Sequence, residues 1–389
     1  STVLGQDAIV TNFGYSRSQV NSLYGKATLS WDNAVFIDVT GRNDWFSTQP
    51  KTERSYFYPS VAGSFILSEY IPMPKWVNMW KMRGSWTVSK YAASIYDINR
   101  TYSTGSVLGN VSASYPSSLY PLDLLPSAER TWEVGTAAYM LGQRLRIDVA
   151  YFNKLYYDRK ISQTISSASG FGTTLINTDE QIVRRGLEIT LDGTIIKSQN
   201  LTWNSLINWS YQHRYYHKLD PIYSADDAFT KVGNRLDIYK RDILLKDPGG
   251  NIIHQNGYPV ESDYQYQIGY GDPDFSLGFS NTVNWKNVIF GISIDGRIGG
   301  LMYNYIWDKM FDTGSHPDTD NQFRYDEVVN KLKNYIGQGV KVVSGEVKYD
   351  KYGNVTSDPR QYAPNDVAVG YQSYMQDISG KGEHGVMSE

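Results

Sequence analysis

Apolar and polar side chains alternate along ten segments of the chain, the period-two pattern of β-strands with one apolar face. In 34–43, for example, Ile37 and Val39 share one face, whereas Asp38 and Arg42 share the other. The alternation predicts strands over 18–31, 34–43, 56–67, 80–88, 129–140, 144–157, 180–195, 200–213, 274–285 and 287–299. We therefore expect an all-β protein with antiparallel strands.

The connections between these strands alternate in length. The short or modest ones are 31–33, 68–79, 141–143, 196–199 and Lys286, and the long ones are 44–55, 89–128, 158–179, 214–273 and the segment from 300 onward. A barrel that crosses an outer membrane has tight periplasmic turns and long extracellular loops. The rhythm therefore favours an up-and-down transmembrane β-barrel with long extracellular loops.

The polar faces of the predicted strands carry charges of both signs, as the wet lumen of a barrel would. The side chains expected to face this lumen are Asp38, Arg42, Arg146, Asp148, Glu188, Asp192, Asp295 and Arg297. We expect Asp148, Glu188 and Asp295 to pair with Arg146, Arg184 and Arg297, respectively. A soluble sheet with one buried face would show the same alternation, so this alternative stays open.

Composition fits a membrane barrel. Tyr (32) far outnumbers Phe (13), and an apolar ring with a polar tip suits the boundary between water and lipid. The chain has no cysteine, and no apolar run is long enough for a transmembrane helix. A net charge of −3 indicates no nucleic-acid partner. The first residues do not form a signal peptide, so we expect processing or an upstream start.

Six strings in this order resemble motifs of the SusC/RagA family of TonB-dependent transporters. They are Asp38-Val-Thr-Gly-Arg-Asn-Asp-Trp45, Ser55-Tyr-Phe-Tyr-Pro-Ser-Val-Ala-Gly-Ser-Phe65, Lys81-Met-Arg-Gly-Ser-Trp86, Glu129-Arg-Thr-Trp-Glu-Val-Gly135, Asp272-Pro-Asp-Phe-Ser-Leu-Gly-Phe-Ser-Asn281 and Asp295-Gly-Arg-Ile-Gly-Gly300. One such string would be weak, but six in the family's order are specific. Together they cover most of residues 18–300.

The resemblance implies part of a 22-stranded, plugged barrel in the bacterial outer membrane. The whole protein would import oligosaccharides or peptides with energy supplied through the TonB complex and with a SusD-like surface lipoprotein as partner. The chain contains no recognisable plug domain, TonB box or closing strands. Ten strands would leave two open edges, which lipid does not tolerate, so we expect a part of a larger transporter. Residues 1–300 would form the barrel strands, and 301–389 an extracellular loop with one short helix over 325–335.

The sequence offers no pattern of catalytic residues, so no enzyme activity and no cofactor are predicted. It contains no P-loop, dinucleotide fingerprint or nucleophile elbow. His213 and His217 are four residues apart, but they lie where a strand enters a loop, and we expect no metal site there. A glycoside hydrolase would need two facing carboxylates about 5–10 Å apart, a feature that sequence spacing does not reveal.

Substrate contacts are expected from loop and rim tyrosines, whose rings can stack on sugars. The candidates are Tyr91, Tyr96, Tyr102, Tyr115 and Tyr120 in one group, and Tyr215, Tyr216 and Tyr223 in another. For each of them, simple loop packing is the alternative. For the whole chain, the main alternative is a soluble secreted β-rich carbohydrate-binding module.

Overall fold

The computed structural model describes residues 17–94, 103–107, 110–119, 121 and 123–388. The chain divides into two compact units. The first comprises 1–226, 230–236 and 277–296, and the second comprises 227–229, 237–276 and 297–389.

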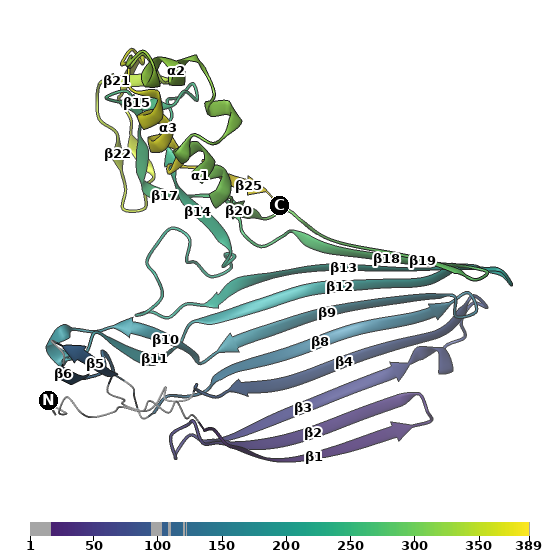
Figure 1. Cartoon of the computed structure of the whole chain (residues 1–389). Coiled ribbons are helices and arrows are strands. Elements are labelled where there is room, and N and C mark those ends of the chain that lie inside the picture. The colour runs from purple at the N-terminus through teal and green to yellow at the C-terminus, as the bar shows by residue number, and fades with distance from the viewer. Residues whose placement is uncertain (1–16, 95–102, 108–109, 120, 122, 389) are drawn as a thin grey trace. The chain divides into compact units, whose positions relative to one another are not determined.

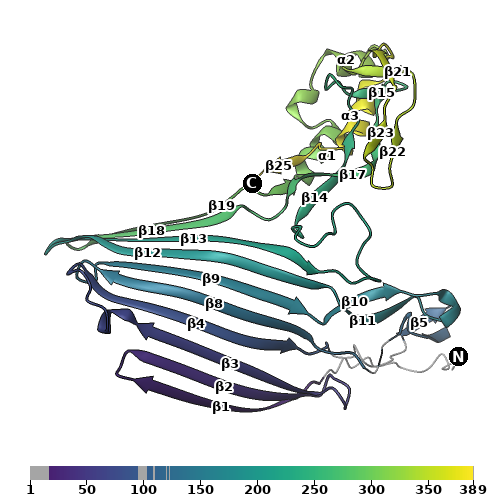
Figure 2. The same ribbon diagram turned by 180° about the vertical axis from the view of Figure 1, so that it is seen from behind.

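The first unit is built on one ten-stranded sheet (Figures 1 and 2). Its strands are β1 (Val20–Trp31), β2 (Val35–Phe46), β3 (Ser55–Ile66), β4 (Val77–Tyr91), β8 (Ser127–Met140), β9 (Leu145–Tyr157), β12 (Gln181–Lys197), β13 (Leu201–Lys218), β18 (Phe275–Trp285) and β19 (Val288–Ile298). Their order across the sheet is their order along the chain. All ten predicted strands are therefore confirmed, and the up-and-down arrangement with them. The main difference is β13, which continues five residues beyond its predicted end.

The short connections gather at one end of the sheet, on the right in Figure 1, which we call the short-turn end. The β1–β2 turn has positive φ at Asp32 (51°) and Asn33 (52°), the geometry of a tight hairpin turn that matches strand twist. The opposite, long-loop end carries small strands within its loops. They are β5 (Ser103–Val107), β6 (Asn110–Ser114), β7 (Ser118–Leu119), β10 (Arg159–Thr164) and β11 (Thr173–Thr178).

The strand registers give the sheet two chemically different faces. Asp148 of β9 is paired with Ala137 of β8 and Thr190 of β12, and Thr190 with Asn208 of β13, so these side chains share a face that we call the charged face. The other face, the apolar face, carries large side chains that stay exposed. Examples are Leu29 (66 %), Val134 (49 %) and Ile294 (56 %).

No second layer covers this apolar face in the described part of the chain, since its large side chains are exposed. A soluble sheet would bury such a face against a core. The apolar face is instead what a transmembrane barrel presents to lipid. Both edge strands, β1 and β19, are exposed along their whole length, and each has only one hydrogen-bonded neighbour among the described strands. The barrel is therefore partial in this chain.

The second unit contains three helices and several short strands. The helices are α1 (Tyr305–Thr313), α2 (Gln322–Val328) and α3 (Tyr371–Ser379). The strands are β14 (Ile238–Leu244), β15 (Ile253–Gln255), β16 (Tyr258–Pro259), β17 (Glu261–Tyr270), β20 (Leu301–Tyr303), β21 (Val340–Ser344), β22 (Lys348–Tyr349), β23 (Val355–Ser357), β24 (Gln361–Pro364) and β25 (Val386–Ser388). None of the helices in the described residues is long and apolar enough to span a membrane.

The helix predicted over 325–335 is wrong in its bounds. It starts earlier, because the side chain of Asn321 caps it by accepting a hydrogen bond from the amide of Arg324. It ends at Val328, and Lys331 has a positive φ of 57° that an α-helix does not allow. The helical spacing of apolar residues beyond Val328 misled the prediction, because Val329 and Leu332 are exposed and pack on no helix face.

Aromatic side chains from distant segments form the core of the second unit. Tyr374 of α3 is 3 % exposed, and its hydroxyl lies 3.0 Å from Nε2 of His254 in β15. Burial lowers the pKa of His254, which keeps the imidazole neutral inside this cluster. Tyr335 packs edge-on against Tyr374 at 4.8 Å between ring centroids. Segments 237–276 and 297–389 thus share one core, which sequence alone did not indicate.

Candidate functional site: the charged face of the sheet

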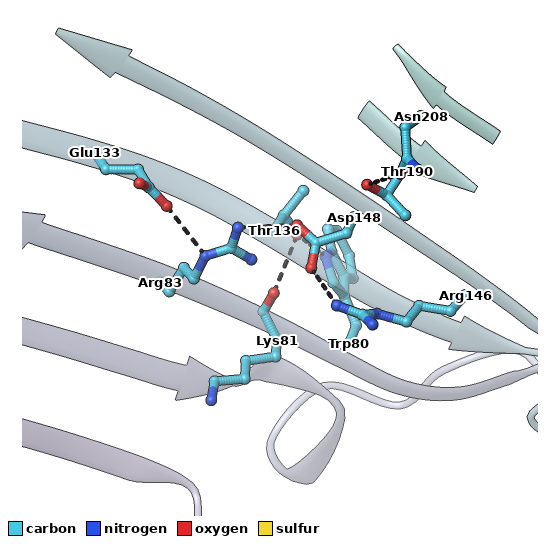
Figure 3. Close-up of polar contacts among 9 residues, drawn as sticks. All are labelled: Trp80, Lys81, Arg83, Glu133, Thr136, Arg146, Asp148, Thr190 and Asn208. Carbon is cyan, nitrogen blue, oxygen red and sulfur yellow. Dashed lines mark hydrogen bonds and ion pairs between the residues drawn. The ribbon is translucent and has the colours of Figure 1, made fainter. Parts of the chain in front are cut away.

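An ion-pair cluster connects three neighbouring strands on the charged face (Figure 3). The guanidinium of Arg83 in β4 donates to Asp148 in β9 at 2.9 Å and to Glu133 in β8 at 3.4 Å. Arg146 donates to the second oxygen of Asp148 at 3.0 Å. Asp148 therefore accepts from two arginines, and its side chain is only 15 % exposed. Charge-assisted bonds of this kind cross-link the strands.

Glycine at position 135 makes this cluster sterically feasible. Arg83 must pass over β8 to reach Asp148, and in the register it lies opposite Gly135. A Cβ atom on Gly135 would stand 2.8 Å from Cζ of Arg83 and 3.0 Å from its Nε, closer than real Cβ contacts allow. The absence of a side chain at this position thus lets the guanidinium lie flat across the strand.

The predicted ion pairs are partly confirmed. Arg146 pairs with Asp148 as expected, and the role of Arg83 was missed because its partners lie on other strands. Glu188 forms no ion pair with Arg184 among the described residues. Four residues along a strand span about 13 Å, too far for a direct contact. Nor do the described residues include an ion pair for Asp295 or Arg297; Asp295 instead lies beside Gly278, where a Cβ would come within 2.9 Å of its carboxylate.

The remaining predicted charges fall on the same face. Asp38 accepts from Thr28 at 2.6 Å and pairs with Lys26 at 3.2 Å, both across the β1–β2 ladder. Arg42 pairs with the nearly buried Asp44 at 2.7 Å. Asp192 lies opposite Arg146 in the β9–β12 register. Charged side chains of both signs are therefore present on this face from β1 to β12, as expected for a surface in contact with water.

At the long-loop end, Asp220 fastens two loops together. Its carboxylate accepts from the Thr178 hydroxyl (2.8 Å) and from the amides of Asp179, Ile222 and Tyr223. Burial opposes ionisation, but these hydrogen bonds outweigh it and lower the pKa of Asp220 to about 2. The loop after β13 is thereby fixed to the loop before β12.

The described tyrosines among those predicted to bind substrate lie in different surroundings. Tyr91 is half-exposed and donates to Glu129 at 3.0 Å, and Tyr115 packs against Phe171. Tyr215 and Tyr216 are neighbours in β13 and so point to opposite faces of the sheet. Tyr223 is 39 % exposed in the loop that Asp220 holds. Tyr96, Tyr102 and Tyr120 lie outside the described residues.

Comparison with known proteins decides the family. Residues 2–372 match the model of the TonB dependent receptor-like β-barrel. The chain belongs to this family. As a TonB-dependent receptor barrel, it is a protein of the bacterial outer membrane, as the motifs in its sequence implied.

The relatives of this TonB-dependent receptor chain are much longer than the chain itself. TonB-dependent receptor P26 of Formosa agariphila is 23 % identical over 333 residues, which cover 75 % of the chain and 33 % of the relative. TonB-dependent receptor P3 of the same organism is 20 % identical over 336 residues, with the same coverages. A solved structure of the RagAB peptide transporter superposes with a TM-score of 0.63 at 19 % identity, covering 76 % of the chain and 35 % of that structure. This confirms the fold and the expected resemblance to RagA-type barrels. The chain spans about a third of the length of these relatives.

Proposed function

We propose that this chain forms part of the wall and the outer loops of a TonB-dependent importer that takes up oligosaccharides or peptides rather than transforming them. The charged face would line the lumen, and the apolar face would contact lipid. The observation that carries the proposal is this pairing of faces: a cross-linked polar surface lies opposite an exposed apolar one. A soluble carbohydrate-binding module would not leave such an apolar surface exposed.

Two indole groups on the apolar face support its placement in lipid. An unsatisfied N–H group is costly in hydrocarbon. Trp80 donates its indole N–H to the Thr136 hydroxyl at 2.7 Å (Figure 3), and Trp203 donates to Asn281 at 2.8 Å. Each donor is therefore satisfied within the sheet itself. The two exposed edge strands would pair with further strands of the complete barrel, since open edges are not tolerated in lipid.

A surface lipoprotein of the SusD type is the proposed partner, and the second unit has a surface suited to a protein. Large apolar side chains on α1, on α2 and directly after α2 are more than 40 % exposed. They are Ile306, Phe323, Tyr325, Val328, Val329 and Leu332. Contiguous exposed apolar groups are typical of interaction surfaces, and five of these six side chains follow one another along the single segment 323–332. The RagAB structure is that of a peptide transporter, which makes peptides one of the two cargo classes to test.

Orientation can be tested by cysteine labelling in intact cells, because the chain has no cysteine of its own. Ala225→Cys lies in a long loop, and Gln199→Cys lies in a short turn; both positions are exposed. A membrane-impermeant maleimide should label the first variant in intact cells and the second only after permeabilisation. The reverse pattern would contradict the proposed orientation.

Transport is tested with the whole protein in its own cell. Uptake of labelled peptides and labelled oligosaccharides is compared in cells with and without the transporter, and with and without TonB. The proposal requires that one cargo class be taken up only when both are present. Unchanged uptake of both classes in the transporter deletion would contradict it.

A further inference from the structure

A groove of 480 Å³ opens on the apolar face near the long-loop end of the sheet. Its lining comes from β4, β8, β9, β12 and β13. Four of its residues are apolar, and they are Trp86, Trp132, Leu155 and Val183. Leu155 and Val183 are the buried residues of this lining, and we call them its floor. An acyl chain fits such a surface.

Two arginines make this groove different from the rest of the apolar face. Arg130 and Arg185 both line it, and both are exposed. No ion pair to a carboxylate is found for either of them within the described ranges, and none of the described lining residues is acidic. Cationic side chains on a lipid-facing surface are costly unless an anion compensates them. An anionic ligand would compensate both of them.

The registers set the spacing of the two arginines. Arg130 lies opposite Leu155 in β9, and Arg185 lies opposite Asn153 in the same strand. They are thus two strands apart and offset by two residues, which places their Cα atoms about 12 Å apart. Each side chain can reach a group bound between them. Arg185 is also oriented, because its guanidinium lies 4.6 Å from the centre of the Tyr215 ring.

We infer that this groove binds a phosphorylated lipid of the outer leaflet, with phosphate held by Arg130 and Arg185 and an acyl chain along Trp86, Trp132 and Leu155. Guanidinium groups bind phosphate oxygens through paired, charge-assisted hydrogen bonds. The apolar floor contributes the other part of the binding, because it can contact an acyl chain. It would contribute nothing to the binding of a free anion. The inference rests on the orientation proposed above, which puts the long-loop end in the outer leaflet.

The test uses the whole transporter purified in mild detergent, with lipid A as the probe and native mass spectrometry as the readout. The double variant Arg130→Gln with Arg185→Gln should bind lipid A at least tenfold more weakly than the wild type. The matched control is Lys75→Gln with Lys286→Gln, which removes two cations at the short-turn end and should bind like the wild type. Equal binding by all three proteins would overturn the inference.

Two measurements on the wild type make the result independent of how well the variant folds. Lipid A without its phosphates should bind at least tenfold more weakly than lipid A, and equal binding would contradict a role for the arginines. Inorganic phosphate should not displace lipid A at equal concentration; displacement would make this a site for free anions instead. Because these assays need no cargo, their failure is distinct from a failure of the import proposal, which the uptake and labelling experiments test.

Discussion

Gly135 provides the sharpest test of how the charged face is assembled, because one added methyl group should break an ion-pair cluster. In Gly135→Ala the new Cβ would stand 2.8 Å from Cζ of Arg83, so the guanidinium must move. We expect this movement to disrupt the 2.9 Å bond to Asp148 and the 3.4 Å bond to Glu133. The first is partly buried, and hydrogen bonds to charged groups contribute about 1.5–3 kcal/mol. The second is exposed and contributes about 0–1 kcal/mol.

The loss should therefore be about 2 kcal/mol, offset in part by alanine itself. Alanine in a strand is favoured over glycine by about 0.5–1 kcal/mol, because the unfolded chain loses less freedom. Gly135→Ala should thus lower the free energy of unfolding by about 1 kcal/mol in the wild-type background. With Arg83→Ala already present, the same change should be neutral or stabilising. The coupling energy between the two positions should be about 2 kcal/mol.

Urea unfolding of the complete barrel in lipid vesicles measures all four members of this cycle. Gly84→Ala in β4 is the matched control, since the nearest atom to its new Cβ would be the Glu133 carbonyl oxygen at an ordinary 3.7 Å. It should be neutral or stabilising in both backgrounds. If Gly135→Ala has the same effect with and without Arg83, the proposed steric role of Gly135 is wrong.

Three further predictions concern the two faces and the rim. Val39→Arg should destabilise the assembled barrel by about 2–4 kcal/mol because it places a charge against lipid, whereas Thr40→Arg on the opposite face should cost far less; equal losses in vesicle unfolding would contradict the assignment of faces. Asp220 has a folded pKa of about 2, below its unfolded value of about 3.9, so its contribution of about 2 kcal/mol is present above pH 4 and lost as the pH falls towards 2. The protection factors of amides in the attached loops, which compare the observed exchange rate with the intrinsic rate at the same pH, should therefore fall over that range in the wild type. In Asp220→Asn they should already be low at pH 7 and change little on acidification. Gly186→Ala would bring a Cβ to 2.5 Å from the backbone oxygen of Tyr211, which cannot swing aside, and should cost about 1–3 kcal/mol by the same unfolding assay.

The strands and their two faces were predictable from sequence for a local reason. Side chains alternate across a strand, so a pattern such as Ile37, Asp38, Val39 fixes which residues share a face without knowledge of any partner. The length rhythm of the connections then indicated which strand ends lie together. Motif resemblance added the family, and the family match confirmed it.

The tertiary structure alone decided which charges meet across strands. The Arg83–Asp148 bond joins residues 65 positions apart across an intervening strand, and it depends on a glycine whose purpose no local pattern reveals. The same holds for the second unit, where His254 and Tyr374 meet from segments 120 positions apart. The alternation of apolar and polar residues indicates which side chains of a strand share a face. Contacts between strands also depend on strand register and on the path of the loops. Those are set by the packing of the whole chain, and so they become visible only in three dimensions.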